Sequence, residues 1–80
     1  MGIREVFSHN LQVLRRARGL SQEALAHEAD VDRTYISALE RCVHGASIDM
    51  VQKLASVLGV EPSILLVRPA RARHARPARK

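Results

Sequence analysis

Residues 19–41, GLSQEALAHEADVDRTYISALER, decide the fold of this 80-residue chain. Ser21 and Asp32 are both residue types favoured at helix N-caps, and each precedes a run with apolar residues at helical spacing. The pattern predicts one short helix over about residues 22–28 and another over about residues 33–41. Two capped helices separated by so short a turn are typical of a helix-turn-helix unit.

A helical pattern also precedes this unit. The apolar side chains of residues 4–18 follow an i, i+4, i+7 stripe, formed by Phe7, Leu11 and Leu14. Gly19 is suited to the left-handed conformation that ends a helix. A first helix over about residues 4–18 is therefore predicted.

Two further helices are predicted after the unit. Ser47 and Gly59 are suited to begin and end a fourth helix, and Pro62 suits the first position of a short last one. No segment alternates apolar and polar residues in the way of a half-buried strand. We therefore expect an all-α fold, a compact bundle of four or five helices around one core.

Charge is distributed unevenly along the chain, whose net charge is +5. Residues 68–80, RPARARHARPARK, hold six of the 13 Lys and Arg and no acid, so residues 1–67 sum to −1. The segment 68–80 has no large apolar side chain and is expected to be a disordered tail beside a folded domain of residues 1–67. DNA binding by that domain must therefore rest on where its charges lie.

The composition argues against several other classes of protein. Cys42 is the single cysteine, which excludes an intrachain disulfide and the cysteine-rich zinc modules. No apolar run approaches the ~18 residues of a membrane span, and no secretory signal is present, so we expect a cytoplasmic protein. The four histidines lack metal-ligand spacing, and no third group completes a catalytic set with Cys42 and His44. We predict neither an enzyme nor a cofactor, and no small-molecule substrate is evident.

The sequence resembles the phage repressor and Cro, or Xre-type, helix-turn-helix regulators. The resemblance covers about residues 7–66 and is carried by Gly19-Leu20-Ser21-Gln22-Glu23, Leu25-Ala26, Val31, Arg33 to Arg41, and Leu54-Ala55 with Leu58-Gly59-Val60. Residues 32–37 are also similar to controller proteins of restriction–modification systems. The resemblance implies a lambda-repressor-like DNA-binding domain with the helix at 33–41 in the major groove.

Base contacts are predicted from the outward face of that helix. Ile36 and Leu39 are expected to face the core, which leaves four base-contact candidates: Arg33, Thr34, Ser37 and Ala38. An arginine can donate two hydrogen bonds to guanine O6 and N7, whereas an alanine offers only an apolar contact. The alternative is that the first turn of this helix is simply solvated.

Phosphate contacts are predicted for Gln22, Tyr35 and Arg41. The resemblance implies that the Gln22 amide contacts a phosphate, with a second helix cap as the alternative. Tyr35 can offer its hydroxyl to a phosphate or bury its ring, and Arg41 can reach the DNA backbone or complement the helix dipole. The basic tail would add sequence-independent affinity, unless it serves only solubility.

Two positions are read as structural. The resemblance implies that Arg15 and Glu40 form a partly buried ion pair between the first and third helices. Cys42 stands where the family usually has glycine after the third helix. The loop must therefore end that helix differently, or Cys42 bears strain on the order of 1 kcal/mol.

The expected function is sequence-specific binding of double-stranded DNA by a small dimeric transcriptional regulator. One helix-turn-helix reads only a few base pairs, so a homodimer on an inverted repeat is expected, associated with the nucleoid. The last helix offers excess apolar side chains as a dimer surface: Val60, Ile64, Leu65, Leu66 and Val67. Two alternatives remain, namely a protein-interaction module such as an antitoxin or promoter adaptor, and non-specific DNA binding through the tail.

Overall fold

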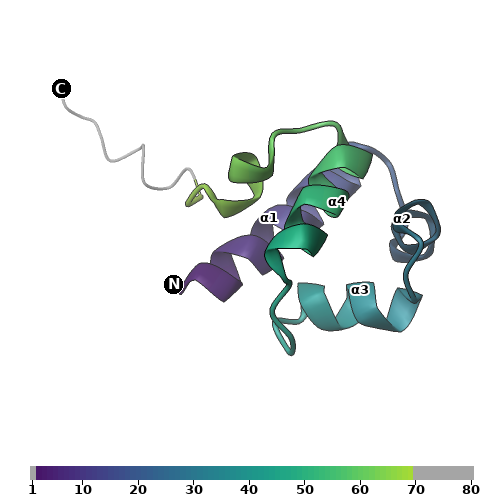
Figure 1. Cartoon of the computed structure of the whole chain (residues 1–80), viewed down its shortest axis with the longest axis horizontal. Helices are drawn as coiled ribbons and strands as arrows, with labels where there is room; N and C mark the ends of the chain where they lie inside the picture. Colours follow the sequence, from purple (N-terminus) through teal and green to yellow (C-terminus); the bar gives the residue numbers. More distant parts are fainter. Residues whose placement is uncertain (1, 70–80) are drawn as a thin grey trace, which may run out of the picture.

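The computed structural model describes residues 2–69, and within them it contains helices and no strand. In chain order the elements are α1 (Ile3–Ala17), α2 (Gln22–Ala29), α3 (Arg33–Glu40), α4 (Ile48–Leu58) and the 3-10 helix η1 (Pro62–Leu66). Helix α2 packs mainly on α3, whereas η1 packs on both α1 and α4 (Figure 1). The all-α expectation is confirmed; the predicted tail lies outside the described residues from position 70 onward.

The helix ends follow the capping residues read from the sequence. Gly19 has a φ of 71°, and the N–H of Leu20 donates to the carbonyl of Arg15 at 3.0 Å, which closes α1 in a Schellman turn. The hydroxyl of Ser21 accepts from the N–H of Ala24 at 3.0 Å. Asp32 occupies the N-cap position of α3 without a side-chain cap bond. The turn between α1 and α2 is therefore fixed by local hydrogen bonds at both of its ends.

One core joins all five elements. Its fully buried side chains come from each of them: Leu11, Leu25, Ile36, Leu39, Leu54 and Leu65. Ala26 is also buried, on the helix that packs most closely against α3. A small buried side chain at this position leaves room for α2 to pack closely against the core.

The structure corrects the predicted role of Leu65. Its side chain is 0% exposed and belongs to the core, so it cannot form part of a dimer surface. The last helix is a 3-10 helix, with about three residues per turn, which turns Leu65 inward while its neighbours face outward. Ile64, Leu66 and Val67 are 44, 41 and 54% exposed.

Polar side chains of α1 and of its C-cap residue Arg18 contact the C-terminal ends of α3, α4 and η1. Each donates a hydrogen bond to backbone carbonyls: Ser8 to Leu39, Gln12 to Glu40, Arg18 to Leu58, and Asn10 to Leu65 and Val67. These contacts satisfy carbonyls that a helix leaves without an internal partner. These contacts tie the C-terminal ends of α3, α4 and η1 to the first helix.

Helix α3 ends at Cys42 in the left-handed conformation, so the strain expected for a residue other than glycine is present there. The φ of Cys42 is 62°, and the N–H of Val43 donates to the carbonyl of Ala38 at 2.9 Å, so α3 ends in the turn that usually contains glycine. We expect Cys42→Gly to raise the free energy of unfolding by about 1 kcal/mol, because glycine adopts this conformation without steric cost. Chemical denaturation would measure the difference.

Asp30 provides the matched control, because its φ of 59° is nearly the same. Aspartate tolerates the left-handed conformation better than most residues, so Asp30→Gly should stabilise the domain less than Cys42→Gly does. Equal gains for the two variants would contradict the assignment of strain to Cys42.

Candidate nucleic-acid interface

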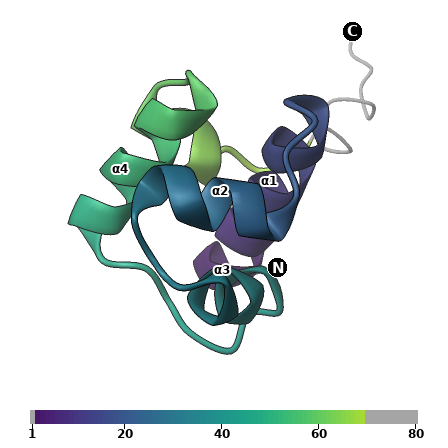
Figure 2. The ribbon, with the colours of Figure 1, turned by 90° about the vertical axis from the view of Figure 1, so that its right-hand side faces the viewer.

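Helix α3 presents a polar face at the edge of the molecule. Arg33 and Thr34 are exposed in its first turn, while Ile36 and Leu39 are fully buried on its opposite side. Helix α2 lies against α3 in both views, and α3 forms the lower edge in each (Figures 1 and 2). The core and α2 thus hold the N-terminal end of α3 in a fixed position with its polar residues free.

The C-terminal half of α3 differs from the sequence interpretation. Ala38, predicted to face outward, is only 7% exposed, so its methyl group is not available as a base contact. At this point the chain folds back over the end of α3, as the hydrogen bond from Val43 to the Ala38 carbonyl shows. Ser37 is half-buried, and its hydroxyl accepts a hydrogen bond from Arg41 Nε at 3.4 Å.

The structure contains the predicted ion pair of Arg15 and Glu40. Arg15 Nε lies 2.6 Å from Glu40 Oε2 and Nη2 lies 3.0 Å from Oε1, a bidentate contact between α1 and α3. The two side chains are only 10 and 2% exposed. Arg15 also donates to the carbonyl of Leu20 at 2.8 Å. The pair therefore ties α3 to α1 and to the turn before α2.

Gln22 joins this buried network. Its Nε2 donates to Glu40 Oε1 at 3.0 Å, a contact that sequence reasoning did not anticipate and that differs from both readings considered for this amide. Glu40 thus accepts from α1 and α2 together, and all three helices of the interface meet at one carboxylate. The side chain of Gln22, at the first position of α2, is thereby held in one orientation.

The remaining phosphate candidates lie near the ends of α3. Tyr35 is half-buried and packs against the core, so its ring takes part in packing while part of the side chain stays accessible. Arg41 is exposed at the C-cap of α3. Both positions border the exposed face that starts at Arg33.

The described residues offer no competing metal or membrane feature. Within residues 2–69, no group of three His, Cys, Asp or Glu side chains could hold a metal ion. No helix in the same range is both long and apolar enough to cross a bilayer. Cys42 is half-buried and His44 exposed, in the loop after α3.

Comparison with known proteins identifies the family. The helix-turn-helix family model HTH_3 matches residues 11–65. A hypothetical transcription factor of Neisseria meningitidis is 39% identical over 67 residues, and control protein C.BamHI of Bacillus amyloliquefaciens is 42% identical over 65. The matched segments cover 84 and 80% of this chain, and 63 and 80% of those proteins. The chain thus spans less than two thirds of the Neisseria relative.

Solved structures show the same likeness. A hypothetical transcription factor from Neisseria superposes with a TM-score of 0.85 at 35% identity, covering 94% of this chain and 86% of its own. The biofilm regulator SinR, solved in complex with DNA, superposes with a TM-score of 0.73 at 31% identity, covering 76 and 98%. These relatives are regulators and not enzymes, as the sequence predicts for this chain. With a family match over most of its described residues, the chain belongs to the helix-turn-helix family HTH_3.

Proposed function

We propose that the protein binds double-stranded DNA sequence-specifically, as a dimeric transcriptional regulator. The observation that carries this proposal is the exposure of Arg33 and Thr34 at the N-terminal end of α3, on a helix whose other side is locked into the core. In helix-turn-helix proteins this end of the second helix approaches base edges in the major groove. The named relatives, among them a regulator solved with DNA, support the same conclusion.

Each exposed or half-buried polar side chain of the proposed interface has a role that suits its chemistry. The Arg33 guanidinium donates to guanine O6 and N7, and Thr34 donates, accepts or meets a thymine methyl. Ser37 stays a base-contact candidate, with less accessible surface. Arg41 and the hydroxyl of Tyr35 contact phosphates on either side, as do the free N–H groups at the start of α2 and the second amide hydrogen of Gln22.

Dimerisation would double the sequence that the protein reads. The exposed apolar side chains of η1 and its C-cap, Ile64, Leu66 and Val67, supply the surface, with half-buried Val60 at its edge. Leu66 also lines two neighbouring hollows of about 430 and 360 Å³. Side chains of a second copy can pack into these hollows. A two-fold dimer on this surface binds an inverted repeat, and such a protein is nucleoid-associated.

Selection of duplexes from a random pool tests the proposal. At ~0.15 M salt non-specific attachment is weakened, so an enriched inverted repeat is expected. If no sequence is enriched while the protein is well folded, the proposal is wrong and a protein-interaction module replaces it. Salt-sensitive binding without any preference would instead indicate non-specific attachment through the basic tail.

Arg33→Ala should lower the ratio of specific to non-specific affinity about 5- to 150-fold, the equivalent of ~1–3 kcal/mol for one bidentate base contact. Guanine should no longer be preferred at one position of each half-site. Titration of the selected duplex and a scrambled duplex would measure the ratio. Lys53→Ala removes an exposed cation from α4 and is the control, with an expected ratio close to wild type. An unchanged ratio in Arg33→Ala would contradict a base contact by Arg33.

A further inference from the structure

The structure sorts the cations of the domain into two groups. Arg15 is held by Glu40, and Arg18 donates to the carbonyl of Leu58 at the end of α4. Five others are exposed within residues 2–67: Arg4, Arg16, Arg33, Arg41 and Lys53. Because this part of the chain carries a net charge of −1, its electrostatic attraction to phosphates depends on where the exposed cations lie.

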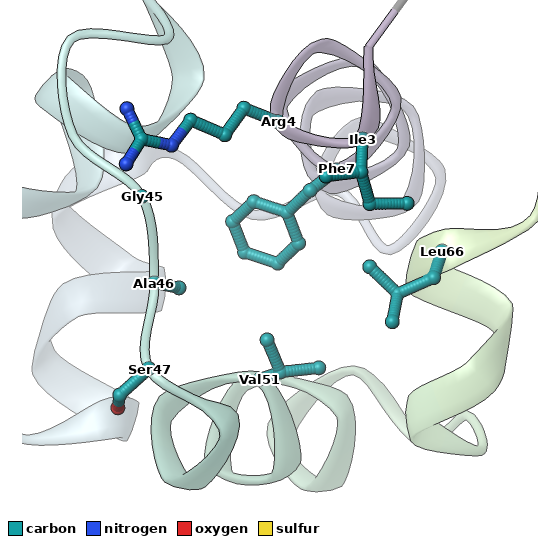
Figure 3. Close-up of a pocket in the computed structure, with 8 residues that line it drawn as sticks. All are labelled: Ile3, Arg4, Phe7, Gly45, Ala46, Ser47, Val51 and Leu66. Carbon is teal, nitrogen blue, oxygen red and sulfur yellow. The ribbon is translucent and has the colours of Figure 1, made fainter.

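Arg4, in the first turn of α1, lies against the loop that follows α3. A Cβ atom on Gly45 would lie 2.9 Å from Arg4 Nε and 3.4 Å from Cζ, so the guanidinium fits there because Gly45 has no side chain. Figure 3 shows Arg4 extended along the rim to this loop, while Phe7, Val51 and Leu66 point into the hollow beside it. The side chain thus bridges α1 and the loop at residues 41–47.

This loop shares an edge with the recognition helix. In both ribbon views, α3 and the loop after it form the lower edge of the molecule (Figures 1 and 2). Arg33 and Arg41 stand at the two ends of α3, and Arg4 adds a third cation at Gly45, in the loop that follows Arg41. A helix in the major groove is flanked by phosphates, and a guanidinium can donate two hydrogen bonds to one phosphate.

We propose that Arg4, held in place by Gly45, contacts a phosphate of the DNA at the C-terminal end of α3. The inference rests on the proposed DNA binding and assigns to it a residue outside the helix-turn-helix unit. The contact adds affinity that does not depend on base sequence, because every phosphate presents the same charge. It also couples the first turn of α1 to the loop after α3 in the bound state.

The test is the salt dependence of DNA affinity for the full chain. Arg4→Gln should reduce the slope of log affinity against log salt by about 0.9, the value for one phosphate on duplex DNA. Specific and scrambled duplexes should be affected alike. Arg16→Gln makes the same charge change on an exposed residue near the other end of α1 and should leave the slope unchanged.

Gly45→Ala tests the geometry without removing a charge. Gly45 is not among the residues with positive φ, so alanine is not strained there, and its Cβ would displace only the end of a flexible side chain. It should weaken binding in the wild-type background and have no further effect in Arg4→Gln, since both changes remove one contact. Thermal melts of all variants should match wild type.

The outcomes separate this inference from the proposed function. If the wild type binds no duplex, the proposed function is wrong and the Arg4 contact with it. If the wild type binds and Arg4→Gln keeps the wild-type slope, only the Arg4 contact is wrong. Additive losses from Arg4→Gln and Gly45→Ala would also overturn it, because the loop would then act independently of Arg4.

Discussion

Arg15→Ala is expected to lower the free energy of unfolding by about 3–5 kcal/mol, the range for removing one partner of a buried ion pair. The side chain of Glu40 is 2% exposed, and its carboxylate would lose two charge-assisted hydrogen bonds from Arg15. Among the described residues, only the amide of Gln22 would still donate to it. Since small domains are stable by roughly 5–15 kcal/mol, this loss would remove much of the total. Equilibrium denaturation with urea would measure it.

Arg16→Ala is the matched control for this prediction. Arg16 is the next residue along α1, is exposed, and carries the same charge. Its replacement should change the free energy of unfolding by no more than about 0.5 kcal/mol. Equal losses of unfolding free energy in the two variants would contradict the prediction. The effect would then come from helix propensity or net charge, and the buried ion pair would add no stability of its own.

The network around Glu40 also links stability to the proposed DNA binding. The carboxylate receives donors from α1 and α2, and it sits at the last position of α3. A shift of this residue would therefore move α3 relative to the start of α2, the two elements that contact DNA in the proposed complex. A conservative change such as Glu40→Gln should weaken specific binding even where the domain remains folded.

The parts of the fold that depend on local chemistry could be predicted from the sequence. Ser21, Asp32 and Gly19 mark helix ends through caps and the left-handed conformation, and the observed elements begin and end within a residue or so of the predicted ones. The ion pair of Arg15 and Glu40 followed from the family resemblance. Residues 25 positions apart carry no local signal for such a contact.

The wrong predictions concern side chains whose exposure depends on tertiary packing. Helical spacing alone placed Ala38 outward, but the chain folds back over the end of α3 there. Four consecutive apolar residues, 64–67, could not reveal which one enters the core, because that depends on the pitch of η1. The cap contacts of Asn10 and the approach of Arg4 to Gly45 depend on pairs far apart in sequence.

Leu65→Ala is expected to lower the free energy of unfolding by about 2–5 kcal/mol, as for other buried leucines. Its side chain is 0% exposed and joins η1 to the common core, which also contains Leu54 of α4. Removing it leaves a cavity at the point where Asn10 holds the backbone of the same segment. The loss should be seen by denaturation at any protein concentration.

Leu66 separates this effect from dimerisation. It is the next residue, is 41% exposed and borders both hollows of the proposed dimer surface. Leu66→Ala should leave the unfolding free energy of the monomer nearly unchanged but shift the monomer–dimer equilibrium, measured by sedimentation equilibrium, toward monomer. Because binding to a second copy stabilises only the folded state, the melting temperature of the wild type should rise with concentration, and that of Leu66→Ala should rise less. A wild-type concentration dependence retained in full by Leu66→Ala would place the dimer contact elsewhere on the domain.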